Sequence, residues 1–148
     1  MPARRRSRQR ALQLLFLWDA RRQPPDEAID AYFDTLCAEE QPERDAFAVS
    51  LFKGAVGHIA EIDGLISHHA EHWRMERMPA VDRNILRLGV YELLHGATPA
   101  AVTIDEALEL TRKFSGEESV QFVNGVLDAI HRSQAAGPPC AEVDRKSG

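Results

Sequence analysis

One stretch in the middle of the chain decides the fold: Val81-Asp82-Arg83-Asn84-Ile85-Leu86-Arg87-Leu88-Gly89-Val90-Tyr91-Glu92-Leu93. Its apolar side chains fall on more than one side of a helix, whereas a surface helix carries a single apolar stripe. Pro79 precedes the stretch and Gly96 follows it, which are the positions where proline and glycine begin and end helices. We therefore predict a central, buried helix between these two residues.

The segments on either side repeat apolar residues with a helical period and are separated by prolines. We predict a helix over residues 7–22, and a second helix that Asp26 caps and that runs to residue 40. Residues 43–73 are predicted to form a kinked helix or two helices, because three glycines interrupt them.

Two capping boxes predict the remaining helices. In this motif a Ser or Thr at the N-cap is followed three residues later by a Glu that bonds back to its backbone. Thr103 with Glu106 marks one start, and Ser115 with Glu118 marks the other. In the last helix Gly125 is expected to let another helix approach closely. No segment alternates with period two, so the predicted class is all-α: a compact bundle of about seven helices.

Composition places the chain among globular proteins. It has 148 residues, of which 44% are hydrophobic and 28% charged, enough for one domain with a real core. We expect that domain over residues 1–134 and a flexible tail over 135–148. No apolar run approaches about 18 residues, so no membrane helix is expected. Cys37 and Cys140 lack metal-ligand spacing and indicate a reducing cytoplasm, with no disulfide expected.

The net charge of −5 conceals a strong asymmetry. Residues 1–18 hold five arginines and no acidic residue, and the other 130 residues hold 13 basic and 23 acidic side chains. The arginines are Arg4, Arg5, Arg6, Arg8 and Arg10. A basic arm on an acidic body suits a polyanionic ligand, and guanidinium groups both fork onto phosphates and stack on unpaired bases. The arm is therefore a candidate nucleic-acid site, although a solvated terminus without a partner remains the alternative.

Catalytic motifs are scarce. His68-His69-Ala70-Glu71-His72 matches H-x-x-E-H, which supplies two zinc ligands and a general base in some peptidases. Such a site needs a third ligand and a substrate cleft, and the chain offers neither plainly. We therefore interpret His68 and His72 as surface histidines, and we expect no enzyme activity, cofactor or metal.

Four motifs in register resemble the NusB family of transcription antitermination factors. They are the arm with Ala11-Leu12-Gln13-Leu14-Leu15-Phe16-Leu17-Trp18, the stretch over 81–93, Val102-Thr103-Ile104-Asp105-Glu106-Ala107-Leu108-Glu109-Leu110, and Phe122-Val123-Asn124-Gly125-Val126-Leu127-Asp128. The resemblance covers residues 4 to about 132. It departs at Phe16, where many members carry tyrosine, and over residues 23–45, which are acidic and hard to align.

This resemblance implies two helical subdomains and binding to the boxA segment of nascent ribosomal or phage RNA. It implies a partner, the ribosomal protein that acts as NusE, and loading onto the RNA polymerase antitermination complex; a homodimer is left open. The implied RNA-binding residues are Arg4, Arg5, Arg6, Arg8, Arg10, Gln13, Phe16, Glu118 and Phe122. The implied partner-binding residues are Phe16 and Asp82. An aromatic such as Phe122, beside a helix start, could serve as a base-stacking platform.

Three other functions remain open from the sequence. The chain could be the NusB-like domain of a ribosomal RNA cytosine methyltransferase, a helical interaction module without an RNA role, or a zinc hydrolase built on His68 and His72. For the RNA-binding interpretation, replacing Arg5, Arg6 and Arg8 with alanine should weaken RNA binding without lowering stability, since basic residues oppose the dipole at a helix N-terminus.

Overall fold

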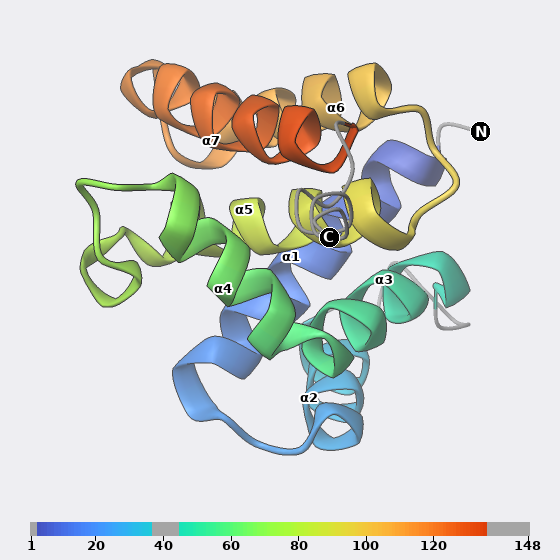
Figure 1. Ribbon diagram of the computed structural model, residues 1–148. Helices are drawn as coiled ribbons and strands as arrows, with labels where there is room; N and C mark the ends of the chain where they lie inside the picture. The colour runs from blue at the N-terminus through green and yellow to red at the C-terminus, as the bar shows by residue number, and fades with distance from the viewer. Residues whose placement is uncertain (1–2, 37–44, 136–148) are drawn as a thin grey trace, which may run out of the picture.

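The computed structural model describes residues 3–36 and 45–135, and these residues form an all-helical bundle without a strand (Figure 1). The α-helices are α1 Ala3–Arg21, α2 Pro25–Ala31, α3 Ala46–Gly57, α4 Ile59–His69, α5 Ala80–His95, α6 Ala100–Phe114 and α7 Glu117–Ala135. A π-helical turn, Tyr32–Leu36, follows α2, and a 3-10 turn, Met75–Arg77, precedes α5. The predicted all-α class is confirmed. Cys37, Cys140 and the tail beyond residue 135 lie outside the described residues.

The predicted central helix is confirmed as α5. It packs against α1, α3, α4, α6 and α7, and its side chains are buried without interruption from Ile85 to Val90. Figure 1 shows α6 and α7 as a pair on one side of α5, with α1 to α4 on the other. Among the described helices, none combines the length and apolar character needed to cross a membrane.

A buried charged network joins α5 to its neighbours. Asp19 on α1 accepts from the Arg83 guanidinium at 2.8 Å and lies 3.1 Å from that of Arg87, and Arg87 also reaches Asp63 on α4 at 2.9 Å. Burial alone would raise the pKa of the Asp19 carboxyl, but the hydrogen bond from Arg83 and the charge of Arg87 outweigh it and lower that pKa. This network fixes how α1, α4 and α5 pack together.

The predicted interruption in residues 43–73 is confirmed as a break between two helices at His58. The helix starts differ from two predictions. The N-cap of α2 is Pro24, and Asp26 lies in its first turn, where its carboxylate pairs with Lys53. Thr103 is buried inside α6, which begins at Ala100 because the preceding Pro99 already fixes the backbone angle of the N-cap.

The turn between α6 and α7 also overturns the second capping box. Ser115 is the C-cap of α6, not the N-cap of α7, and its hydroxyl donates to Asp82 Oδ1 at 2.6 Å. The hydroxyl of Ser119 donates to Asp82 Oδ2 at 2.9 Å. Gly116 between the helices has φ 144°, which side-chain-bearing residues rarely adopt. A buried carboxylate and a glycine therefore shape this turn, and Glu118 caps nothing at Ser115.

Candidate nucleic-acid interface

The first turns of α1 carry three exposed arginines, Arg4, Arg5 and Arg6. The guanidinium of Arg4 lies 3.7 Å from the centre of the Phe47 ring, which orients it by a cation–π contact. Arg5 pairs with Glu106 on α6 at 2.8 Å, and that hydrogen bond raises the pKa of Arg5 and lowers the pKa of Glu106. These three side chains form the part of the arm that a ligand can reach.

Arg8 and Arg10 have turned inward. The Arg8 side chain is 7% exposed and forks onto both oxygens of the buried Glu92, each at 2.8 Å. Arg10 lies 2.9 Å from Asp45, which also accepts from the Ser7 hydroxyl. The expectation that all five arginines fan out toward RNA is therefore wrong for these two. Their role inside the monomer is to tie α1 to α5 and to the start of α3.

The same acidic partners explain why the arm is helical at all. A basic first turn opposes the helix dipole, at a cost of some tenths of a kcal/mol for each charge. Here Glu106, Glu92 and Asp45, which come from outside α1, compensate those charges. The helix begins at Ala3, and these ion pairs offset the unfavourable charges near its start.

Two of the exposed arginines, Arg4 and Arg5, border a groove. A cavity of about 720 Å³ lies between the start of α1, α3, the end of α5 and the start of α6. Arg4, Arg5 and Phe47 line one part of it, and Tyr91 and His95 line another. A second depression, between α1 and α6, carries Arg5, Gln9 and Lys113 beside Glu106 and Glu109. Both hollows combine cations with apolar or polar walls, as a phosphate backbone with attached bases would require.

Farther along α1, Gln13 and Phe16 are exposed as expected. The hydroxyl of Tyr32 donates to Gln13 Oε1 at 2.5 Å and so fixes the amide. Phe16 is 47% exposed, so its ring is accessible to a ligand or partner. Arg6, Gln13 and Phe16 recur at helical spacing, so the accessible face of α1 extends well beyond the arm.

Glu118 and Phe122 belong to α7, next to a different hollow. Phe122 is half-buried, and its ring centre lies 5.9 Å from that of Trp73, whose side chain is 51% exposed. The two rings border a cavity of about 330 Å³. Sequence reasoning counted Trp73 among the apolar residues of a long helix and missed it as a site residue. The sequence held no clear signal for it, because the end of α4 at His69 is seen only in the structure.

Asp82 differs from its expected role as a partner contact. The residue is 3% exposed, and both of its carboxylate oxygens accept from serine hydroxyls of the α6–α7 turn. Because that turn leads directly into Glu118 and Phe122, Asp82 positions the start of α7 from within. A partner could reach this carboxylate only by displacing Ser115 or Ser119.

The histidine motif that could have indicated a zinc peptidase does not form one helix face. α4 ends at His69, and His72 lies in the turn that follows. The ring of His68 packs edge-on against that of His69, with centres 4.8 Å apart. Within residues 3–36 and 45–135, neither His68 nor His72 belongs to a cluster that could hold a metal ion.

Comparison with known proteins agrees with this geometry. Residues 5–132 match the model of the NusB family. The chain is 70% identical over 132 residues to the transcription antitermination protein NusB of Solibacter usitatus, covering 89% of this chain and 90% of that protein. It is 49% identical over 130 residues to the NusB of Koribacter versatilis, covering 87% and 88%.

Solved structures give the same result for the fold. A crystal structure of the antitermination factors NusB and NusE in complex with double-stranded RNA matches with TM-score 0.77 and 33% identity, over 90% of this chain and 98% of that chain. The solution structure of NusB from Aquifex aeolicus matches with TM-score 0.78 and 31% identity, over 93% and 94%.

Proposed function

The chain belongs to the NusB family, and from this premise we propose that it is a transcription antitermination factor that binds boxA RNA together with the ribosomal protein acting as NusE. The observation that carries the proposal is the 70% identity to a curated NusB over nine-tenths of that protein's length. The NusB relative solved with NusE and double-stranded RNA supports both partners.

The RNA contacts follow from which side chains are accessible. We assign phosphate contacts to Arg4, Arg5 and Arg6. Arg4 and Arg5 border the groove at the start of α1, and Arg6 is exposed on the same helix. Gln13 and Phe16 extend this surface along α1, where Phe16 is available to RNA or to the NusE partner. Arg8, Arg10 and Asp82 hold the surface in shape, because their charged groups are used within the monomer.

A second RNA contact is proposed on α7. Phe122 and the exposed Trp73 offer adjacent ring faces on which unpaired bases could stack, and each such stack contributes about 1–3 kcal/mol. Glu118, exposed one turn earlier, would accept from base or sugar groups and disfavour phosphate at that point. The two contact regions together would select RNA with an unpaired segment.

The proposed role is binding, without catalysis, in the cytoplasm and as part of the RNA polymerase antitermination complex. The assignment of residues 1–134 to one RNA-binding domain is kept as part of this proposal. A homodimer stays a prediction, which sedimentation of the free protein would test.

The decisive experiment is a titration of boxA RNA at fixed salt, with and without the NusE partner. We expect modest affinity alone and tighter binding with the partner, because three accessible arginines support few phosphate contacts on an acidic body. A scrambled RNA of equal length is the control. Equal affinity for both RNAs, or no effect of the partner on boxA binding, would contradict the proposal.

The α7 contact is tested by Trp73→Ala and Phe122→Ala. Trp73 is largely exposed, so its removal should weaken boxA binding by roughly tenfold or more while the melting temperature hardly changes. Phe122→Ala should weaken binding similarly and also lower the melting temperature, since that ring packs against the core. If the folded Trp73→Ala variant bound boxA RNA with unchanged affinity, the proposed contact on α7 would be wrong.

A further inference from the structure

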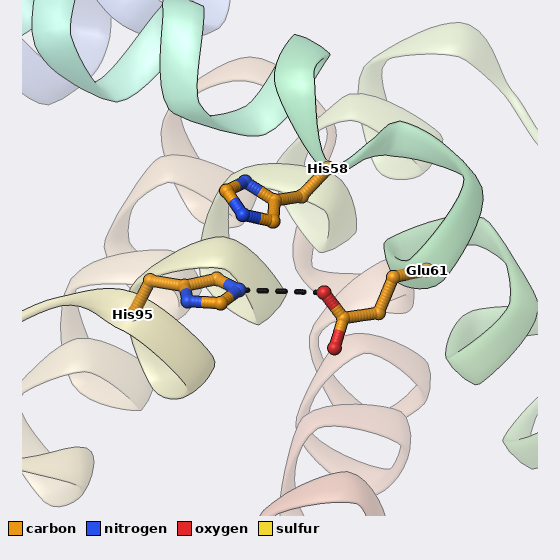
Figure 2. Close-up of side chains that lie close together, drawn as sticks. All are labelled: His58, Glu61 and His95. Carbon is orange, nitrogen blue, oxygen red and sulfur yellow. Dashed lines mark hydrogen bonds and ion pairs between the residues drawn. The ribbon is translucent and has the colours of Figure 1, made fainter.

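Three potential metal ligands gather where α3 meets α4, beside the end of α5 (Figure 2). His58 is the junction residue, Glu61 lies in the first turn of α4, and His95 is the last residue of α5. One ligand atom from each lies within 4.8 Å of the other two. The Nε2 atom of His95 is 3.3 Å from Glu61 Oε1. The cluster is separate from the RNA contacts proposed above, although His95 also borders the large groove.

The donor set fits zinc. Two imidazole nitrogens and one carboxylate oxygen are a recurrent three-ligand set for Zn²⁺, which keeps a fourth position for water. Ligands about 2.1 Å from a tetrahedral ion lie about 3.4 Å from one another, close to the His95–Glu61 separation of 3.3 Å. All three residues are exposed, so small side-chain rotations can shorten the remaining separations.

The backbone already orients His58 for such a role. Its Nδ1 lies 3.0 Å from the carbonyl oxygen of Gly54, and a carbonyl can only accept a hydrogen bond. Nδ1 must therefore carry the proton, which leaves a lone pair on Nε2. Hydrogen bonds of this kind to the second ring nitrogen are the usual support of metal-bound histidines, because they fix both tautomer and ring orientation.

Tyr91 and Gly54 bring the two histidines together. A methyl group on Gly54 would lie 2.2 Å from the Tyr91 hydroxyl oxygen, so the absence of a side chain there lets the tyrosine ring reach α3. The ring centres of His58 and His95 lie 5.9 Å and 5.5 Å from that of Tyr91, and 4.1 Å from each other. The stacked rings hold both histidines on the same side of Glu61, as Figure 2 shows.

We propose that His58, Glu61 and His95 bind one Zn²⁺ ion, with water as the fourth ligand. The ion would link the α3–α4 junction to the end of α5, in addition to the packing of Tyr91 against Gly54. This proposal departs from the expectation of no metal, which considered only the H-x-x-E-H motif and the cysteines. His58 and His95 lie far apart in the sequence, so their spacing does not indicate a shared site. The inference is independent of RNA binding, and its test uses no RNA.

The test is a calorimetric titration of chelator-treated full-length protein with ZnCl₂ at pH 7.5. We expect one ion per chain, and affinity reduced at least about tenfold in each of His58→Ala, His95→Ala and Glu61→Gln, since even indirect support of a ligand is worth 10–100-fold. The matched control is His68→Ala with His72→Ala, which removes two other histidines and should leave zinc affinity unchanged. Circular dichroism verifies that each variant keeps its helix content.

Two further readouts separate a built site from loose surface binding. Zinc should raise the melting temperature of the parent and of the His68/His72 control, but not of His95→Ala. In ¹H–¹⁵N spectra of the histidine rings, zinc should shift Nε2 of His58 and of His95. No stoichiometric binding, an equal loss of affinity in the His68/His72 control, or unchanged affinity in His95→Ala would each overturn the proposal.

Discussion

Arg6 and Arg8 lie two positions apart on α1 and have opposite surroundings. Arg6 is exposed, whereas Arg8 is buried against Glu92, and its hydrogen bonds to that carboxylate raise the pKa of Arg8 even though burial lowers it. An arginine at such a site is not equivalent to one on the surface, because its planar fork satisfies both oxygens of a carboxylate that has no access to water.

Arg8→Ala should therefore destabilise the protein by about 3 kcal/mol, since removing one member of a buried ion pair leaves the other charge uncompensated. Arg21→Ala, at an exposed position of the same helix, is the matched control and should leave the free energy of unfolding nearly unchanged. Urea denaturation of both variants measures the difference. The sequence alone predicted that Arg5, Arg6 and Arg8 can be removed together without loss of stability, and the buried Arg8–Glu92 pair contradicts that prediction. Equal unfolding midpoints for the two variants would show that the sequence-based prediction was right.

Glu106 competes with any phosphate for Arg5. Glu106→Gln keeps the side-chain shape but removes the charge that holds Arg5, so boxA binding should tighten. If Arg5 then gains a phosphate contact, the log–log dependence of affinity on salt should steepen by about 0.7. Asp105→Asn, at an exposed position of the same helix, is the control for a general loss of negative charge. A Glu106→Gln variant with weaker binding would mean that the ion pair itself positions Arg5 for RNA.

At the scale of elements, two glycines of the α6–α7 region illustrate different constraints. Gly116 joins the helices with φ 144°, and a Cβ there would lie 2.9 Å from the Glu118 carboxylate. Gly125 lies within α7, and a Cβ there would meet nothing within 4 Å. The expectation that Gly125 permits close approach of another helix is therefore wrong within this monomer.

Gly116→Ala should destabilise the protein by about 1–3 kcal/mol, because an alanine would be forced into a backbone conformation that L residues avoid. Gly125→Ala should stabilise it by up to about 1 kcal/mol, because alanine has the higher helix propensity and the space is open. Thermal melting of the two variants checks both signs. A stable Gly116→Ala variant would show that the turn can adopt another conformation.

At the scale of the whole molecule, acidic residues from several helices hold the bundle together. Burial by itself would raise the pKa of Asp19 and of Asp45, but the hydrogen bonds and charges of their arginine partners, with the Ser7 hydroxyl at Asp45, lower both values. A lowered folded-state pKa contributes stability that is fully present above the unfolded value of about 3.9 and is lost as the pH falls through the folded value.

We therefore expect the free energy of unfolding to fall steeply below about pH 4, as these carboxylates become protonated. Asp19→Asn should lower the free energy of unfolding at pH 7, because the variant lacks the carboxylate that pairs with Arg83 and Arg87. Its free energy of unfolding should also fall less steeply below about pH 4, because that carboxylate is no longer there to be protonated. Asp26→Asn, at an exposed position, is the control and should follow the parent curve. If the free energy of unfolding depended on pH in the same way in Asp19→Asn and in the parent, Asp19 would not contribute to the acid sensitivity.

The sequence by itself determined the helical class, the burial of α5 and the position of most helices. Apolar periodicity and proline punctuation act locally, so they can be read from neighbouring residues. The burial of Ile85, Leu86, Leu88 and Val90 follows from this pattern, whereas the burial of Arg87 depends on Asp19 and Asp63. The resemblance of four motifs also pointed to the family. Local capping signals were less dependable, since Thr103 and Ser115 are used differently once α6 and α7 are packed.

Only the tertiary structure decided which charges are available to a ligand. Arg8 and Arg6 have the same chemistry in the sequence, and only the approach of Glu92 from α5, 84 positions away, removes one of them from the surface. The contacts of Asp82 with two serines, of Trp73 with Phe122, and of His95 with the local pair His58 and Glu61 likewise form only through packing. Pairings across long separations depend on where whole helices come to lie, which periodicity along one helix does not encode.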